Sequence, residues 1–167
     1  SIFDRFLTLA YRGSSLSLPI LGTVESIETM RKKQILDYYL THYGPKQTIV
    51  AVAGRVDHHQ VVDLVEEKFV WSKKRQARGD DHFQRAKLKG FREYVGRPSE
   101  QVHILLGLPA SHFKSRLRFE AFVANSLLGG GMTSRLYQGI RERRGLAYSV
   151  YSTLMSFLDT GLSLIYA

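Results

Sequence analysis

The stretch LLGGGMTSRLYQGIRERRGLAYSVYS, residues 127–152, predicts the end of one helix, a second helix and the start of a strand. The three glycines at 129–131 end the first helix, because glycine adopts the backbone conformations that helix ends require. The second helix is expected over about 133–145, where another glycine ends it. Apolar and polar residues then alternate over 146–157, which predicts a strand.

The residues on either side extend this pattern to an α+β arrangement. Residues 101–108 form a nearly continuous apolar run, which predicts a strand, and residues 113–127 carry apolar side chains at helical spacing. The tripeptide at 159–161, Asp-Thr-Gly, predicts a turn, and residues 162–166 return as the second strand of a hairpin. The second half is therefore expected to read strand, helix, helix, hairpin.

The first half predicts three helices and one strand. The helices are expected over 2–10, 23–42 and 58–69, and a short β-branched run predicts a buried strand over 48–53. The apolar residues expected to face inward from the second and third helices are Ile27, Met30, Ile35, Tyr38, Tyr39, Val61, Val62, Leu64 and Val65. We therefore predict the α+β class, with antiparallel-rich sheets and helices packed on one face.

A basic segment separates the two halves. The chain of 167 residues has 24 Lys and Arg against 15 Asp and Glu, and two thirds of the net charge of +9 lies in residues 72–97. Low apolar content and three glycines predict a linker over 72–96, between domains at 1–71 and 97–167. Nucleic-acid binding is an alternative, with Phe83, Phe91 and Tyr94 as stacking groups. No nucleic-acid motif accompanies them, so a solvated connector is preferred and no nucleic-acid partner is expected.

The sequence lacks the residues that a metal site, a phosphate-binding loop or a membrane span needs. The chain has six histidines, none of which is paired with a carboxylate at H-x-x-E-H spacing, and it has no Cys. The glycines at 129–131 follow a helix and lack the Lys-Ser/Thr of a P-loop. No apolar run approaches the roughly 18 residues of a membrane span. We expect no metal site and no span in this chain; the compartment stays open among bacterial cytoplasm, periplasm and mitochondrial matrix.

The stretch at 127–152 resembles the second-domain signature of the insulinase/pitrilysin-type zinc peptidases, which carry an inverted H-x-x-E-H motif. Within that family it is most similar to the branch of mitochondrial processing peptidase β-type subunits and their bacterial homologues. Other segments resemble the family in the same order, so the resemblance covers nearly the whole chain outside the basic segment. They are LPILGTVESI at 18–27, HYGPKQTIVAVAGRVD at 42–57, RPSEQVHILLGLP at 97–109 and DTGLSLIYA at 159–167.

The resemblance implies a LuxS/MPP-like metallopeptidase fold with incomplete domains. Residues 1–71 resemble the closing part of the first domain, and residues 97–167 the opening part of the second, substrate-binding domain. The family's zinc motif and general-base glutamate have no counterpart here, so this chain alone is expected to have no catalytic residues, while zinc is expected in a full-length parent. The implied partners are a peptide or unfolded polypeptide and the remaining half of the peptidase or a homologous subunit. Exposed strand edges predict self-association as well.

Arg141 and Tyr148 are the candidate substrate-binding residues, together with Gly129, Gly130 and Gly131. The family binds the substrate backbone with an Arg and a Tyr at R-x-x-x-x-x-x-Y spacing, and these two residues match it. A guanidinium and a phenol can both donate hydrogen bonds to a carbonyl that becomes an oxyanion. Spacing alone favours a solvated helix charge and an ordinary strand aromatic; the resemblance reverses that preference.

Three functions follow from these observations. The first is a fragment of a zinc-dependent metalloendopeptidase that contributes substrate-binding elements and is inactive alone. The second is a non-catalytic subunit of the same family that binds peptides or serves as a scaffold. The third is a basic nucleic-acid-binding module, whose affinity would fall steeply with salt.

Overall fold

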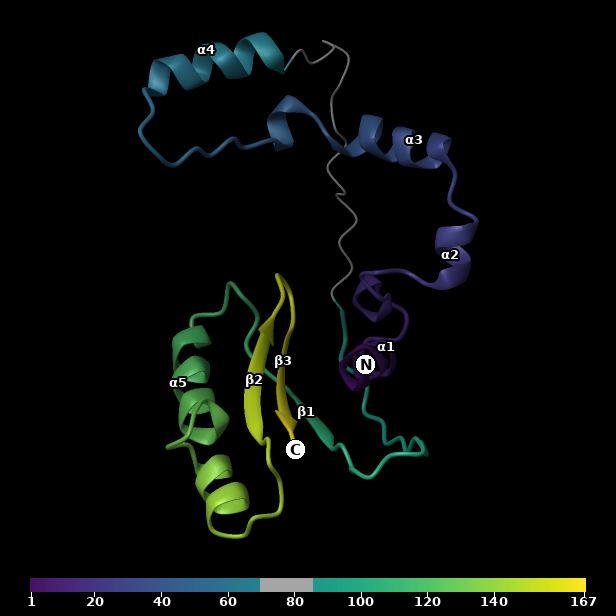
Figure 1. The fold of residues 1–167 in the computed structure, drawn as a ribbon, viewed down its shortest axis with the longest axis vertical. Helices are drawn as coiled ribbons and strands as arrows, with labels where there is room; N and C mark the ends of the chain where they lie inside the picture. Colours follow the sequence, from purple (N-terminus) through teal and green to yellow (C-terminus); the bar gives the residue numbers. More distant parts are fainter. Residues whose placement is uncertain (70–85) are drawn as a thin grey trace. The chain divides into compact units, whose positions relative to one another are not determined.

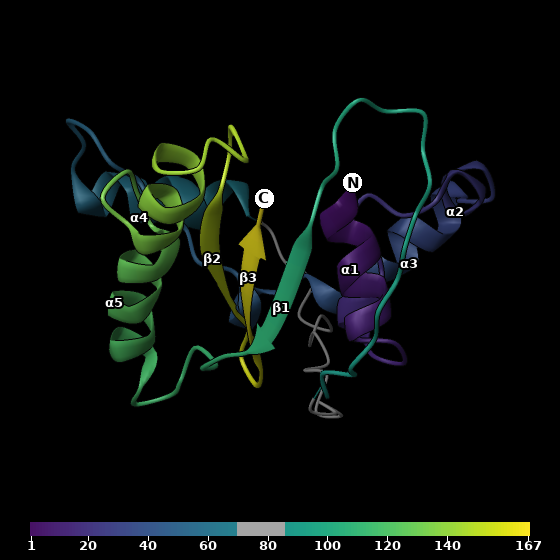
Figure 2. The same ribbon diagram turned by 90° about the horizontal axis from the view of Figure 1, so that it is seen from below.

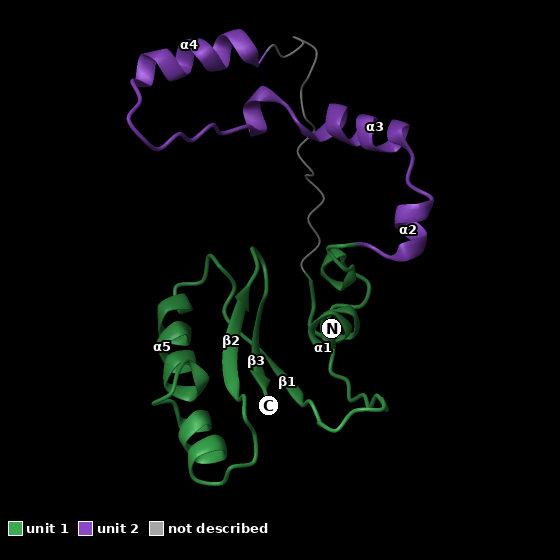
Figure 3. Ribbon diagram, in the orientation of Figure 1, with its two compact units in different colours: residues 1–21, 84–167 green, residues 22–83 purple. Residues whose placement is uncertain are grey.

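The computed structural model describes residues 1–69 and 86–167 (Figure 1). The chain divides into two compact units (Figure 3). The sheet unit consists of Ser1–Leu21 and Gln84–Ala167, and the helical unit is Gly22–Phe83. The N-terminal segment therefore belongs to the same unit as the C-terminal strands.

The division into domains that the sequence predicts, at 1–71 and 97–167 with a linker at 72–96, stays a prediction. Much of that linker lies outside the described residues.

An antiparallel sheet of three strands forms the centre of the sheet unit. Its strands are β1 (Leu105–Pro109), β2 (Tyr151–Ser156) and β3 (Gly161–Tyr166), in the order β1-β3-β2 (Figure 1). β2 and β3 form the predicted hairpin, in which Ser156 lies opposite Gly161. The predicted α+β class with antiparallel strands is confirmed, although β1 and β2 are shorter than their apolar patterns indicated.

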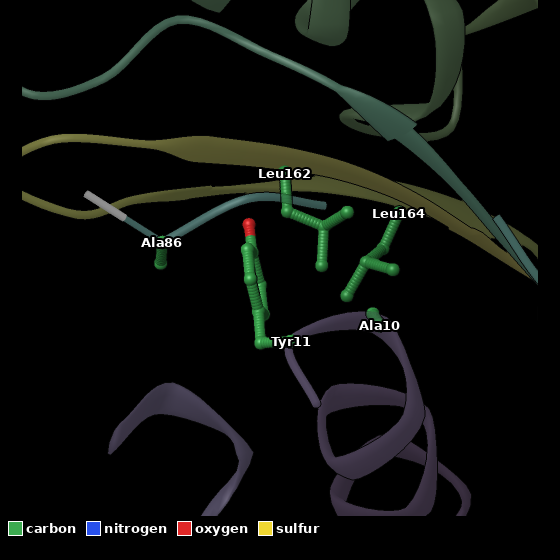
Figure 4. Packing of buried hydrophobic residues seen from close by; sticks show 5 residues of the cluster. All are labelled: Ala10, Tyr11, Ala86, Leu162 and Leu164. Carbon is green, nitrogen blue, oxygen red and sulfur yellow. The ribbon is translucent and has the colours of Figure 1, made fainter. Parts of the chain in front are cut away.

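Helix α1 (Ile2–Ala10) packs against one face of this sheet. Ser1 caps its N-terminus in a capping box with Asp4, in which the Asp4 N–H donates to Ser1 Oγ and the Ser1 terminal ammonium donates to the Asp4 carboxylate. Where the helix ends, Ala10 and Tyr11 are fully buried against Leu162 and Leu164 of β3 (Figure 4). This cluster is the hydrophobic core of the sheet unit.

Helix α5 (Arg118–Gly129) packs against β2 on the other face. Helix α5 contacts Ser152 of β2, which lies opposite Ile165 of β3. Successive side chains of a strand point to opposite faces, so Ile165 and Ser152 lie on the face opposite to that of the core residue Leu164. Figure 2 shows α1 and α5 on opposite sides of the strands. The arrangement differs here from the expectation of helices on one face, because the apolar side of α1 is buried on the face that α5 leaves open.

The helical unit contains α2 (Val24–Glu28), α3 (Lys32–His42) and α4 (His58–Lys68). The single helix predicted over 23–42 is interrupted at 29–31, because Gln34 accepts a hydrogen bond from the Arg31 backbone N–H and starts a new helix there. The η1 (Ser15–Ser17) and η2 (Pro45–Gln47) segments are short 3₁₀ turns in the sheet unit and the helical unit, respectively.

Two predictions for the helical unit are wrong. Residues 48–53 form no strand, since no other strand of the described helical unit lies beside them to pair with. Most apolar residues expected to face inward are exposed, including Ile27 at 59% and Tyr38 at 61%. A helix buries an apolar stripe only where another layer covers it, and the described residues of this unit supply no such layer.

In the part of the chain that the structure describes, no helix is long and apolar enough to cross a membrane.

Candidate functional site

The three glycines at 129–131 differ in their surroundings. Gly129 is the buried last residue of α5, and a Cβ there would lie 2.6 Å from Ser152 Oγ and closer still to the Ser152 backbone N. A Cβ on Gly130 would lie 2.6 Å from the Cα of Ser126. A Cβ on Gly131 would meet nothing within 4 Å. The first two glycines therefore permit close packing within the unit, whereas a side chain on the third would meet no neighbouring atom.

Reciprocal hydrogen bonds hold α5 against the start of β2. Ser152 Oγ donates to the Asn125 carbonyl at 3.2 Å, and Asn125 Nδ2 donates to the Ser152 carbonyl at 3.4 Å. Ser152 is buried, so these bonds form where water competes weakly. They place the glycine run beside the first residues of β2.

The helix predicted over 133–145 contains the π-helical segment η3 (Tyr137–Glu142). The Arg143 N–H donates to the Gln138 carbonyl at 3.1 Å, which is the i→i−5 bond of a π-helix. Gly145, with φ at 60°, occupies a left-handed conformation and ends the segment. The chain then turns back towards β2, which brings Tyr148 to the end of η3.

Arg141 lies over two tyrosine rings. Its guanidinium carbon is 4.6 Å from the centroid of the Tyr148 ring and 4.9 Å from that of Tyr137. Both distances are typical of cation–π contacts. The structure thus brings together the Arg and Tyr that the sequence singled out.

Arg141 also retains its hydrogen-bonding capacity. It is half-buried, and no carboxylate of residues 1–69 and 86–167 lies within ion-pair distance of its guanidinium. Tyr148 is 84% exposed, so its hydroxyl is open to solvent. The pair therefore offers N–H and O–H donors to an incoming acceptor.

Sequence reasoning missed Tyr137. Its position four residues before Arg141 on a predicted helix was a usable signal, because residues at that spacing share a helix face. In the structure Tyr137 contacts Arg141 and also lines a neighbouring hollow of about 580 Å³. The residues that line this hollow are Phe3, Gly129, Gly130, Gly131, Met132, Tyr137, Val150, Tyr151, Ser152 and Thr153.

The residues that the structure describes do not supply the ligands of a zinc site. They contain no group of three or more His, Cys, Asp or Glu side chains positioned to hold a metal ion. The adjacent rings of His58 and His59 are 5.7 Å apart, but two nitrogen ligands do not make up the three or four that zinc requires.

A family model described as "Peptidase M16 inactive domain" matches residues 29–167. The chain belongs to the M16 peptidase family. The resemblance to insulinase/pitrilysin-type peptidases, inferred from the glycine run and the segments around it, is thereby confirmed.

Bacterial proteins named as zinc proteases are relatives of this M16 chain. An uncharacterized zinc protease of Streptomyces coelicolor is 38% identical over 99% of the chain, and one of Mycobacterium leprae is 39% identical over 98%. The matched region is 38% of each of these relatives. The chain therefore spans about two fifths of their length.

Solved structures share the fold. A chain of Complex III2 from Candida albicans, determined with Inz-5 bound, superimposes with a TM-score of 0.81 at 22% identity and covers 99% of this chain and 41% of its own. A protease from Helicobacter pylori superimposes with a TM-score of 0.75 at 24% identity, covering 98% and 40%. A peptidase M16 inactive domain from Pseudomonas fluorescens also gives 0.75, at 18% identity and with the same coverage.

Proposed function

We propose that this M16 chain is the non-catalytic, substrate-binding portion of a zinc metalloendopeptidase. In this proposal Arg141 and Tyr148 hold a backbone carbonyl of a polypeptide, and Gly129, Gly130 and Gly131 let the polypeptide approach closely. Zinc and its ligands belong to the remaining part of the parent or to a homologous subunit. Family membership and the zinc-protease names of the relatives support the parent's activity.

The observation that carries the proposal is the half-buried guanidinium of Arg141 held over the Tyr148 ring with no carboxylate partner among the described residues. A cation that only stabilised the fold would normally be paired or fully solvated. Two aromatic faces instead fix its position and leave its N–H donors for a ligand. Such fixed donors stabilise negative charge on a carbonyl oxygen without reorganisation.

Binding of an unfolded polypeptide tests the proposal. A fluorescein-labelled, unstructured peptide is titrated with the chain, and its anisotropy is measured for the original protein and for Arg141→Ala. We expect Arg141→Ala to weaken binding about tenfold or more, because a hydrogen bond to a charged group contributes about 1.5–3 kcal/mol.

Arg143→Ala is the matched control, because it removes the same charge two residues along the chain, at the exposed residue that directly follows η3. Equal losses in the two variants would show general electrostatics and would refute the assignment to Arg141. A scaffold function predicts no loss in either variant.

In a full-length parent, the same pair is expected to act in the transition state. Arg141→Ala and Tyr148→Phe should each lower kcat for peptide hydrolysis by up to about 10²–10³, the effect of removing one oxyanion donor. Zinc content should stay unchanged in both variants. This result would distinguish a loss of transition-state stabilisation from damage to the metal site.

A further inference from the structure

We propose that the hollow beside the glycine run binds one aromatic side chain of the polypeptide, and that Arg141, which has five N–H donors, pairs with an acidic residue next to it as well as with the backbone carbonyl. The inference rests on the proposed function and adds a sequence preference to it. The favoured ligand is an extended segment that contains an aromatic residue followed by Asp or Glu.

The lining of the hollow suits an aromatic ring. Phe3, Tyr137 and Tyr151 provide three rings, and Met132 and Val150 provide aliphatic and thioether surface. Aromatic pairs and sulfur–aromatic contacts are favourable beyond the area that they bury. At about 580 Å³ the hollow lies in the size range of sites that hold small ligands.

The glycine run keeps this hollow open. Gly131 lines it, and a Cβ there would meet nothing within 4 Å, so a side chain at this position would extend into free space. Its φ is not in the left-handed region, so substitution causes no backbone strain. The absence of a side chain at Gly131 is therefore not required by the fold, and it leaves room for a ligand.

Ser152 of β2 is one of the residues that line the hollow, and its carbonyl accepts a hydrogen bond from Asn125 Nδ2 of α5. This bond uses one of the two acceptor positions of that carbonyl. The proposed recognition relies on the side chains that line the hollow.

Tyr137 connects the hollow to a cation. Its ring lines the hollow and lies 4.9 Å from the Arg141 guanidinium carbon. Residues 135–144 contain four arginines, at 135, 141, 143 and 144, and only one acidic residue, Glu142. This charge complements an acidic residue on a ligand whose neighbouring side chain occupies the hollow.

Labelled peptides test the preference with the 167-residue chain. Three unstructured peptides of otherwise identical Gly, Ser and Thr sequence carry Phe-Glu, Ala-Glu or Phe-Lys at their centre, and anisotropy gives their dissociation constants. We expect Phe-Glu to bind at least tenfold more tightly than either of the others, since burial of a Phe side chain contributes about 1.5–3 kcal/mol.

Variants of the hollow locate the binding. Gly131→Leu should weaken Phe-Glu binding at least tenfold, whereas Gly139→Leu should not, because a Cβ on Gly139 also meets nothing within 4 Å but Gly139 lies outside the lining. Met132 is 73% exposed, so Met132→Glu should fold normally and weaken the same peptide. Met30→Glu is its control, since Met30 is also exposed, at 53%, and lies in the helical unit.

The outcomes separate the two proposals. If Phe-Glu and Ala-Glu bind equally and Arg141→Ala weakens both, the aromatic preference is wrong and the proposed function stands. If Phe-Glu binds best but neither Gly131→Leu nor Met132→Glu weakens it, the hollow is not the site and this inference fails. If no peptide binds, or Arg141→Ala has no effect on any, the proposed function fails as well.

Discussion

Replacement of Gly129 by Ala tests how α5 and β2 are held together. A Cβ at this position would lie 2.6 Å from Ser152 Oγ and 2.9 Å from Ser152 Cβ, and closer still to the Ser152 backbone N. A strand backbone cannot move aside as a flexible side chain can. The new methyl group must therefore push the end of α5 away from β2 and strain the hydrogen bonds between Asn125 and Ser152.

The expected cost follows from this geometry. Overpacking of a close contact costs about 1–3 kcal/mol, whereas Ala in place of Gly gains about 1 kcal/mol or less at a helix end. We expect a net loss of about 1–2 kcal/mol in the free energy of unfolding. For a domain of about 100 residues that loss lowers Tm by roughly 4–16 °C.

Thermal unfolding followed by far-UV circular dichroism measures this change. Gly131→Ala is the matched control, because it adds the same methyl group two residues along the chain in open space. Its Tm should stay within about 4 °C of the original, since surface substitutions usually change stability by about 0.5 kcal/mol or less. A Gly129→Ala protein as stable as Gly131→Ala would show that the close approach is not real.

Three further changes test the sheet unit. Burial raises the pKa of the Tyr11 hydroxyl. The neutral hydroxyl therefore contributes stability below about pH 10, and this contribution is lost as the pH rises. Tyr11→Phe should reduce the alkaline loss of stability that urea unfolding curves measure. The Arg5 side chain, through hydrogen bonds of 2.7 Å, lowers the pKa of Glu93, so stability should fall as the pH drops below about 4.5, and Glu93→Gln should reduce that acid dependence. Gly161→Ala should lower Tm by several degrees in differential scanning calorimetry, because its Cβ would lie 2.6 Å from the Ala110 carbonyl oxygen.

Local patterns in the sequence predicted the elements that depend on near neighbours. The hairpin of β2 and β3 follows from alternation on either side of an Asp-Thr-Gly turn, and the structure contains it. Arg141 and Tyr148 were singled out through the family resemblance, and their contact in the structure is a local one, because one short turn at Gly145 separates their elements. In each case the residues that contact each other are separated by no more than a few tens of residues along the chain.

Elements that depend on distant neighbours were missed or predicted wrongly. Phe3 lines the same hollow as Gly129, although more than a hundred residues separate them in the chain, and no local pattern shows this. The run at 48–53 has the composition of a strand, but a strand needs a partner, which the pattern does not supply. The π-helical bonding of η3 likewise has no periodic signature in so short a segment.

The π-helical bonding of η3 has a consequence for how the Arg and Tyr positions are recognised in other sequences. An ordinary α-helix advances about 100° per residue, so removal of one residue from 137–140 would restore α-helical bonding and turn everything after it by roughly that angle. Arg141 and Tyr148 would then keep their separation in the chain but face another direction relative to the helix that precedes η3. A search that counts only the seven-residue spacing of the Arg and the Tyr would accept both arrangements. The type of helical turn that precedes the arginine is thus as much a part of the motif as the distance along the chain.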